Sequence, residues 1–200
     1  RPAVLTAAAI PYQAPLPGGR LRIVAFGGSQ GARIMSDVVP SAIDLLTPAE
    51  RLRLDIVQQA RDEDVGRVRQ TYARLGVAAD VSSFFADMPA RIAASHVVVA
   101  RSGASTVAEL SVIGRPSILV PLPQSLDGDQ AANAETLAQC GAAQVIPQAE
   151  FTPRRLAAEL SARLADPSGL AAAAAAARGA GIPDAAERLA DLVLRLARKN

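Results

Sequence analysis

The chain has 200 residues, a length that suits one domain or two small ones and allows folding without disulfides or a metal. Hydrophobic residues make up 50% and charged residues 20%, which excludes an intrinsically disordered chain, and aromatic residues reach only 3%, so an aliphatic core is predicted. The net charge is +2, and the basic residues are scattered among the acids without an aromatic stripe, so we predict no nucleic-acid partner.

The chain begins with a stretch rich in Pro, Gly and Ala, Pro2–Gly19, which predicts a linker or extended lead-in. Short apolar runs then alternate with segments of helical spacing. The predicted strands are Leu21–Phe26, Leu52–Val57, Asp80–Phe85, His96–Ala100, Ser117–Pro121 and Ala143–Ile146. The predicted helices are Ala32–Leu46, Asp62–Leu75, Met88–Ala94, Ser105–Ile113, Asp129–Gln139, Pro153–Ala165, Gly169–Arg178 and Asp184–Arg198.

This alternation of strands and helices requires crossover connections and therefore a parallel sheet. The predicted strands are unbroken apolar runs, as expected when helices cover both faces of the sheet. We therefore predict an α/β fold, a Rossmann-like doubly wound parallel sheet of about six strands. The run of alanines at Ala171–Ala177 is predicted to be a plain surface helix.

The chain holds one cysteine, Cys140, and one histidine, His96, so neither an internal disulfide nor a Cys- or His-based metal site is predicted. No apolar run reaches the ~18–20 residues of a membrane span, and we expect no signal peptide. A chain that opens on Arg1 rather than Met is expected to be a fragment or a processed product.

Ligands bind to open parallel sheets at the C-terminal ends of the strands, and two Gly- and Ser-rich loops follow predicted strands there. The first is GGSQGA at Gly27–Ala32, where Ser29 caps the helix or donates to a phosphate oxygen; a tight turn that needs Gly is the alternative. The second is RSGASTVAE at Arg101–Glu109, where Glu109 complements the helix dipole or accepts hydrogen bonds from sugar hydroxyls. Two such helix starts suit a diphosphate linked to a sugar or nucleoside.

Two further loops follow strands. The loop at Pro121–Gln130 leads into a helix on which Gln130 and Asn133 share one face and bind sugar hydroxyls; alternatively, Asp129 is only a helix N-cap and the amides face solvent. The loop SFFADM holds Phe84 and Phe85, against which a base packs or whose backbone it contacts; ordinary core packing is the alternative.

Catalytic side chains of the common types are not evident. There is no Ser-His-Asp arrangement, because His96 begins a buried strand and is predicted to be structural, and no pair of carboxylates is placed for glycosidase chemistry. The pattern indicates a nucleotide-sugar site without its own general base, and no catalytic residue, metal or cofactor is predicted in this chain.

Four strings in order resemble the MurG family of bacterial peptidoglycan glycosyltransferases, which convert lipid I to lipid II: GGSQGAR at Gly27–Arg33, RSGASTVAE at Arg101–Glu109, DQxxNA at Asp129–Ala134 and IPDAAER at Ile182–Arg188. The resemblance implies a GT-B enzyme with two Rossmann-like domains, of which this chain is the C-terminal donor half. Residues 1–20 would be the interdomain lead-in, residues 21–183 the domain that binds UDP-GlcNAc, and residues 184–200 a C-terminal helix.

The resemblance also implies the reaction and its setting. The MurNAc 4-hydroxyl of lipid I attacks the anomeric carbon of UDP-GlcNAc with inversion and releases UDP. An N-terminal domain before Arg1 would bind lipid I and supply the base, and the enzyme would be a peripheral protein at the cytoplasmic face of the inner membrane. Helix N-termini and backbone donors stabilise the charge on departing UDP, so no metal is required.

Site residues follow from the same resemblance. Arg1 would end the interdomain segment and help to bind the donor. Ser29, with Gln30 beside it, would lie near the diphosphate, and the backbone of Phe85 would contact uracil. The helix start that holds the nucleotide would comprise Ala104, Ser105, Thr106, Val107, Ala108 and Glu109, with Glu109 on the ribose hydroxyls. Gln130 and Asn133 would bind the GlcNAc hydroxyls.

Two alternatives from other classes remain open at this stage. One is another GT-B-shaped enzyme such as a UDP-GlcNAc 2-epimerase, and the other is a non-catalytic nucleotide-binding or interaction module. The C-terminal helix bears on the second, because Leu189, Leu192, Val193 and Leu196 lie on one face. This face packs toward the N-terminal domain, docks on its own domain, or stays exposed and promotes self-association.

Overall fold

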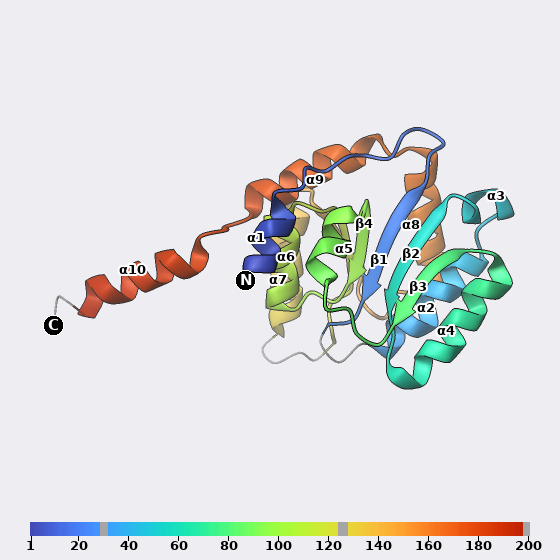
Figure 1. The fold of residues 1–200 in the computed structure, drawn as a ribbon, viewed down its shortest axis with the longest axis horizontal. Coiled ribbons are helices and arrows are strands. Elements are labelled where there is room, and N and C mark those ends of the chain that lie inside the picture. Colours follow the sequence, from blue (N-terminus) through green and yellow to red (C-terminus); the bar gives the residue numbers. More distant parts are fainter. Residues whose placement is uncertain (29–31, 124–127, 198–200) are drawn as a thin grey trace.

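A single parallel sheet organises the chain. The computed structural model describes residues 1–28, 32–123 and 128–197, without the side chain of residue 196. Six strands are paired in the order β3-β2-β1-β4-β5-β6, and every pairing is parallel (Figure 1). The strands are β1 (Leu21–Phe26), β2 (Leu54–Gln59), β3 (Ala78–Ser82), β4 (Val97–Ala100), β5 (Ser117–Leu119) and β6 (Ala143–Val145). The predicted α/β fold with a doubly wound parallel sheet of about six strands is confirmed.

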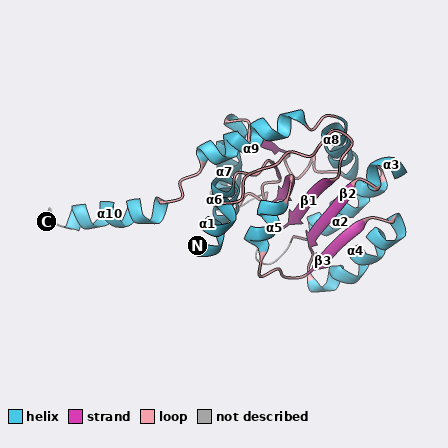
Figure 2. Ribbon diagram, turned by 45° about the horizontal axis from the view of Figure 1, so that its top comes forward, coloured by secondary structure: helices cyan, strands magenta, loops and turns pink. Residues whose placement is uncertain are grey.

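Helices cover both faces of the sheet (Figure 2). One face packs against α2 (Arg33–Asp44), α4 (Asp62–Leu75) and α8 (Pro153–Ala165), with buried Leu, Ile, Val and Met between them. The other face packs against α1 (Pro2–Ala8), α5 (Met88–Ala94), α6 (Ala104–Ile113), α7 (Asp129–Gln139) and α9 (Ser168–Ala180). The central strand β4 is buried at all of its residues, which explains its unbroken apolar sequence.

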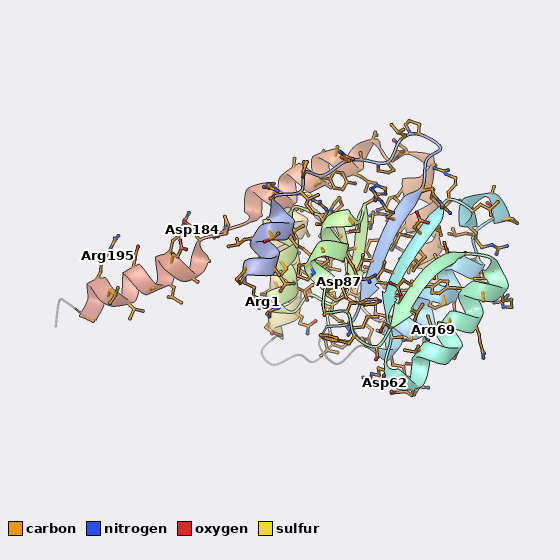
Figure 3. All side chains as sticks on the ribbon, viewed as in Figure 1. Arg1, Asp62, Arg69, Asp87, Asp184 and Arg195 are labelled. Carbon is orange, nitrogen blue, oxygen red and sulfur yellow. The ribbon has the colours of Figure 1, made fainter. Side chains whose placement is uncertain are left out.

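The last helix, α10 (Ala185–Ala197), extends away from the domain (Figures 1 and 3). Its large apolar side chains are more than half exposed: Leu189 61%, Leu192 53%, Val193 56% and Leu194 55%. Of the arrangements considered for this helix, the structure therefore shows an exposed apolar stripe of Leu189, Leu192 and Val193 rather than docking on its own domain, and Leu194 lies on another face of the helix. Within the described residues, no helix is both long and apolar enough to cross a membrane.

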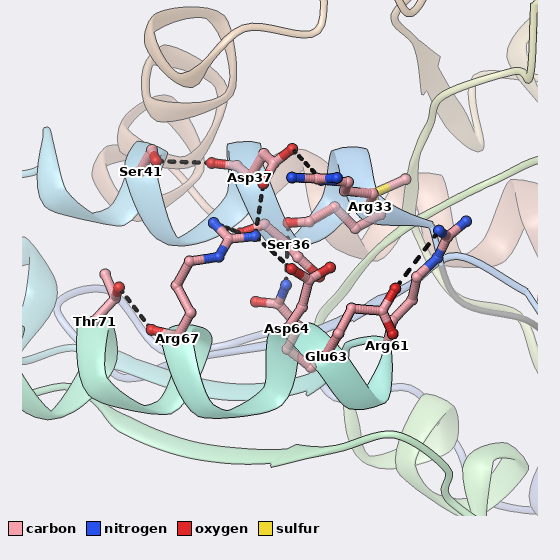
Figure 4. Close-up of polar contacts among 11 residues, drawn as sticks. Arg33, Ser36, Asp37, Ser41, Arg61, Glu63, Asp64, Arg67 and Thr71 are labelled. Atoms are coloured by element: carbon pink, nitrogen blue, oxygen red, sulfur yellow. Dashed lines mark hydrogen bonds and ion pairs between the residues drawn. The ribbon is translucent and has the colours of Figure 1, made fainter.

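An ion-pair network links α2 to α4 on the face of the sheet that these helices share with α8 (Figure 4). Nη2 of Arg67 lies 2.7 Å from Oδ1 of Asp37 and 2.8 Å from Oδ1 of Asp64. Asp64 is 5% exposed, and the hydrogen bond from Arg67 lowers the pKa of its carboxyl group. The network therefore links the two helices to each other on this face of the sheet.

Two sequence expectations about local structure are wrong. Residues 2–8 are not extended: they form α1, whose Val4 and Ala7 are buried against α5 and α6. The alanine-rich helix α9 is not a plain surface helix, because Ala174 and Ala177 are buried. A Cβ atom on Gly181, just after α9, would lie 2.8 Å from the carbonyl oxygen of Ser111 in α6, so the two helices approach closely.

A short helix is missing from the predicted elements, and two strands are displaced by a few residues: β2 begins later than the predicted Leu52–Val57, and β3 begins and ends earlier than the predicted Asp80–Phe85. Helix α3 (Pro48–Arg51) begins with a capping box, in which Glu50 N–H donates to Thr47 Oγ1 at 3.3 Å and Thr47 N–H donates to Glu50 Oε2 at 2.8 Å. Strand β3 ends at Ser82, so Phe84 and Phe85 lie in the loop beyond it.

Candidate functional site

The candidate site lies where the direction of chain winding reverses. Strands β1 and β4 are neighbours at the centre of the sheet, and the helices that follow them, α2 and α6, pack on opposite faces. Their connecting loops therefore diverge at the C-terminal edge of the sheet, which is where open α/β sheets bind ligands. The two Gly- and Ser-rich loops are the ones at this point.

The loop after β1 is a tight turn that requires glycine. A Cβ atom on Gly27 would lie 2.1 Å from the backbone nitrogen of Ala32, and Gly28 has φ of +91°. Helix α2 then begins without a side-chain cap and without an acidic residue in its first turn. The predicted site residues Ser29 and Gln30 lie outside the described residues.

The loop after β4 leads to a helix N-terminus that is open to a ligand. Gly103 is the N-cap of α6, no side chain caps it, and the first turn contains no acid. The N–H groups of Ala104, Ser105 and Thr106 precede the first hydrogen bond of the helix, in which Val107 N–H donates to Gly103 O at 3.0 Å. A Cβ atom on Gly103 would meet nothing within 4 Å. These backbone donors and the helix dipole suit an anion.

Val107 and Ala108, which were also predicted to hold the nucleotide, lie beyond the open N–H groups of α6. The side chain of Val107 packs against the second core cluster. Ala108 is exposed, and its carbonyl accepts a hydrogen bond from Ser111 Oγ at 2.9 Å. The open donors thus belong to the first three residues of the helix.

Two predicted site residues that are far apart in the sequence, Arg1 and Glu109, form an ion pair. Nη1 of Arg1 lies 2.8 Å from Oε1 of Glu109, although the residues are 108 positions apart. Helix α1 packs along α6 and so brings Arg1 to this point (Figure 3). The side chain of Glu109 is 16% exposed and that of Arg1 70%, so the pair contributes little to stability but orients the carboxylate.

Gln130 and Asn133 lie at the start of α7 and are bound to the loop after β4. Ser102 Oγ donates to the Gln130 carbonyl at 2.7 Å, and Asn133 Nδ2 donates to the Ser102 carbonyl at 3.2 Å. Gln130 Oε1 accepts from Leu122 N–H at 3.0 Å. Asp129 is the first helical residue rather than the N-cap, which is Gly128. The two amides are therefore fixed relative to the N-terminus of α6.

Phe85 lies apart from the other predicted residues, after the edge strand β3. The residue is 8% exposed, and the Arg91 guanidinium lies 4.2 Å from the centroid of its ring. The ring is thus already packed, as in the alternative of ordinary core packing. Among the described residues, its backbone N–H and carbonyl have no hydrogen-bond partner, so the backbone remains available to a base. Phe84 is 70% exposed.

His96 is structural, as predicted. It lies at the opposite, N-terminal edge of the sheet, where Nδ1 accepts from Arg22 N–H at 2.9 Å and the carbonyl accepts from Tyr12 Oη at 3.2 Å. Burial, and secondarily the charges of Arg22 and Arg115, lowers its pKa to about 4. The imidazole is therefore neutral near pH 7.

A hollow of about 640 Å³ lies away from this edge, between α5 and the part of β1, β2 and β3 that the helices on this face leave uncovered. Among its charged side chains, Arg91 lies 2.7 Å from both Asp80 and Asp87, and Asp55 lies 3.3 Å from Arg20. None of the predicted site residues lines it, so it is not the candidate site. Within the described part of the chain, no group of three His, Cys, Asp or Glu residues is placed to hold a metal.

Residues 22–189 match the model of the glycosyltransferase family 28 C-terminal domain. The chain belongs to glycosyltransferase family 28. It is 61% identical over 98% of its length to a protein of Bradyrhizobium diazoefficiens and 63% identical over 98% to one of Methylobacterium nodulans. Both are named UDP-N-acetylglucosamine–N-acetylmuramyl-(pentapeptide) pyrophosphoryl-undecaprenol N-acetylglucosamine transferase. The chain spans about half the length of these curated relatives, 54% and 53%.

Solved structures agree with the family. The crystal structure of Acinetobacter baumannii MurG superposes with a TM-score of 0.81 at 30% identity, covering 92% of this chain and 54% of that one. A putative UDP-N-acetylglucosamine 2-epimerase from Listeria monocytogenes has a TM-score of 0.63 at 15% identity, covering 98% of this chain and 51% of that one. The second likeness shows the fold alone. The chain is therefore a family 28 C-terminal domain with the GT-B fold.

Arg101 and Ser102 begin the motif RSGASTVAE, but no role was predicted for either residue. Both are buried at the end of β4, and their polar atoms bond the connection between β5 and α7. A sequence signal exists, because a charged residue directly follows the apolar run HVVVA at the end of a predicted strand.

Proposed function

We propose that this chain binds UDP-GlcNAc as the donor half of an inverting glycosyltransferase that adds GlcNAc to lipid I and yields lipid II in peptidoglycan synthesis. The observation that carries the proposal is the identity of 61% and 63%, over 98% of the chain, to transferases named for these substrates. The uncapped N-terminus of α6 beside the Glu109 carboxylate supports it, because a nucleoside diphosphate needs both an anion site and an acceptor for ribose hydroxyls.

In the proposed complex each part of the donor meets a different element. The diphosphate lies at the N–H groups of Ala104, Ser105 and Thr106. The ribose hydroxyls donate to Glu109, which Arg1 holds in place. The backbone of Phe85 contacts uracil. The amides of Gln130 and Asn133, with Ser29 and Gln30 in the loop after β1, complete the site as the family resemblance implies.

The proposed chemistry needs little from this half beyond orientation and charge stabilisation. The 4-hydroxyl oxygen of MurNAc forms a bond to the anomeric carbon of GlcNAc while the bond from that carbon to the β-phosphate oxygen breaks. The proton of the hydroxyl passes to a base from the part of the relatives that this chain does not span. UDP gains negative charge as it leaves, and the α6 N-terminus stabilises that charge where it develops, without a metal.

The proposed location follows from the substrates. UDP-GlcNAc is cytoplasmic and lipid I is held in the membrane by its undecaprenol chain, so we place the protein at the cytoplasmic face of the inner membrane as a peripheral protein. Lipid I is bound through the part of the relatives that this chain does not span.

Calorimetric titration tests the donor half. The 200-residue chain is titrated with UDP-GlcNAc, UDP-GalNAc and UDP, beside Glu109→Ala and the control Glu187→Ala, which removes an equal charge from α10. We expect saturable binding that weakens about ten-fold or more in Glu109→Ala, the loss expected for hydrogen bonds to a charged group. Equal binding by both variants would contradict the role of Glu109.

A chimera tests the reaction. The segment that precedes the matched region in the Bradyrhizobium diazoefficiens enzyme is joined to Arg1, and GlcNAc transfer to lipid I is measured. We expect transfer by the chimera and only donor binding by the 200-residue chain. Release of UDP and ManNAc from UDP-GlcNAc would indicate an epimerase instead, and tight binding of a protein partner without nucleotide preference would indicate a non-catalytic module.

A further inference from the structure

A buried arginine lies directly beneath the candidate site. Arg101 follows β4 and is 8% exposed. Its Nη1 donates to the carbonyls of Val120 at 3.1 Å and Pro121 at 3.0 Å, and its Nη2 donates to Oε1 of Gln148. Among the described residues no carboxylate pairs with it. A buried charge without a counter-charge costs free energy. We therefore attribute the role of Arg101 to the fork of N–H donors on its guanidinium, which bonds several acceptors at once.

The segment that Arg101 holds leads to the proposed sugar-binding amides. Val120 and Pro121 directly follow β5, and Leu122 N–H, the next donor along the chain, bonds to Gln130 Oε1 at 3.0 Å. Arg101 thus fixes the beginning of the connection from β5 to α7. The residue beside it, Ser102, fixes the other end through the Gln130 carbonyl and Asn133 Nδ2.

The same two residues continue directly into the anion site. Gly103 is the N-cap of α6, so the backbone that carries the guanidinium also carries the open N–H groups. The geometry places the diphosphate donors and the sugar amides on two elements, α6 and α7, joined through Arg101 and Ser102. A change in this joint alters the position of the sugar amides relative to the diphosphate.

We propose that Arg101 is a positioning residue for sugar recognition: it holds the connection from β5 to α7 so that Gln130 and Asn133 face the sugar of the nucleotide-sugar donor. The inference rests on the proposed function. Both hydrogens of Nη1 and one of Nη2 donate to protein oxygens, so we assign Arg101 a role in holding the protein rather than in contacting the donor. Lysine cannot replace it, since one ammonium group does not reach the Val120 and Pro121 carbonyls and Gln148 in the same fork geometry.

The test separates sugar recognition from nucleotide binding. Arg101→Lys is titrated with UDP, UDP-GlcNAc and UDP-GalNAc, and the Kd ratio of UDP-GalNAc to UDP-GlcNAc is compared with that of the unchanged chain. We expect this ratio to fall by about five-fold or more while the Kd of UDP changes by less than about two-fold, because only the sugar contacts shift.

The chain offers a matched control in Arg115→Lys. Arg115 is 1% exposed and likewise donates to carbonyls, those of Ala93, Ile113 and Gly114, but it precedes β5 at the opposite edge of the sheet. Thermal unfolding is expected to show a loss of stability in both variants, and the sugar ratio is expected to change only in Arg101→Lys. If Arg101→Lys does not fold, Gln148→Ala removes one anchor and is expected to lower the ratio in the same direction.

Several outcomes would overturn the inference. One is an unchanged sugar ratio in both Arg101→Lys and Gln148→Ala while the unchanged chain discriminates the two sugars. Another is an equal weakening of UDP and UDP-GlcNAc, which would place Arg101 at the nucleotide. A ratio near one for the unchanged chain also counts against it. Failure of the unchanged chain to bind UDP or UDP-GlcNAc would instead overturn the proposed function, and this inference with it.

Discussion

A methyl group added at the N-cap of α6 separates ligand binding from stability. Gly103 has φ of −60°, which alanine also adopts, and its added Cβ would meet no heavy atom within 4 Å. Replacing glycine at such a position gains about 0.4–1 kcal/mol from the unfolded chain, and alanine is a poorer N-cap by several tenths of a kcal/mol. We therefore expect Gly103→Ala to change the free energy of unfolding by less than about 1 kcal/mol.

The same methyl group is expected to impair binding of UDP. Phosphate oxygens accept from backbone N–H groups at about 2.7–3.2 Å, so a methyl group beside the first turn of α6 displaces them. Loss of one hydrogen bond to a charged group costs about 1.5–3 kcal/mol, which corresponds to about a ten-fold or greater rise in the Kd of UDP. The measurements are calorimetric titration with UDP and urea unfolding followed by circular dichroism.

Two further glycines serve as controls for Gly103→Ala. Gly169→Ala on α9 also adds a methyl group in open space; it is expected to raise stability by up to about 1 kcal/mol and to leave the Kd of UDP unchanged. Gly27→Ala places a Cβ atom 2.1 Å from Ala32 N and is expected to lower stability as well as binding. An unchanged Kd of UDP in Gly103→Ala would refute the placement of the diphosphate at α6.

Three more substitutions test other features. The pKa of buried His96 is lowered from 6.5 to about 4, so the unfolded chain takes up the proton first as the pH falls. The free energy of unfolding is therefore expected to be highest above pH 6.5 and to fall by up to about 3 kcal/mol toward pH 4. His96→Asn is expected to remove this loss in urea unfolding across that range, and an unchanged pH slope would contradict it. Tyr72 Oη donates to buried Gln58 Oε1 at 2.5 Å, so Tyr72→Phe is expected to cost about 1–3 kcal/mol in urea unfolding, and no measurable cost would mean that water satisfies Gln58. Leu192→Glu on α10 is expected to reduce self-association in sedimentation velocity without lowering Tm, and the control Leu194→Glu, on another face of the helix, is expected to leave association unchanged. Equal effects of both variants would contradict self-association through the apolar stripe.

Much of the architecture could be predicted because its signals are local. The apolar run of β1 and the predicted bounds of α4, α5, α7 and α8 agree with the structure, since each depends on periodicity and on nearby Gly or Pro. Helix α3 was predictable in the same way from the spacing of Thr47 and Glu50 in its capping box. Helix α1 was not, because its buried side chains gain their stability from α5 and α6, which lie far along the chain.

The candidate site could likewise be predicted only where its signals are local. The sequence by itself determined which loops follow strands, and an alternating α/β pattern places those loops at one edge of the sheet. Only the tertiary structure decided that Arg1 meets Glu109, that Phe85 is covered by Arg91, and that Arg101 and Ser102 hold the sugar amides. These contacts join residues from different elements, many of them far apart in the chain, and their partners are set by how helices pack across the sheet rather than by any pattern within one segment.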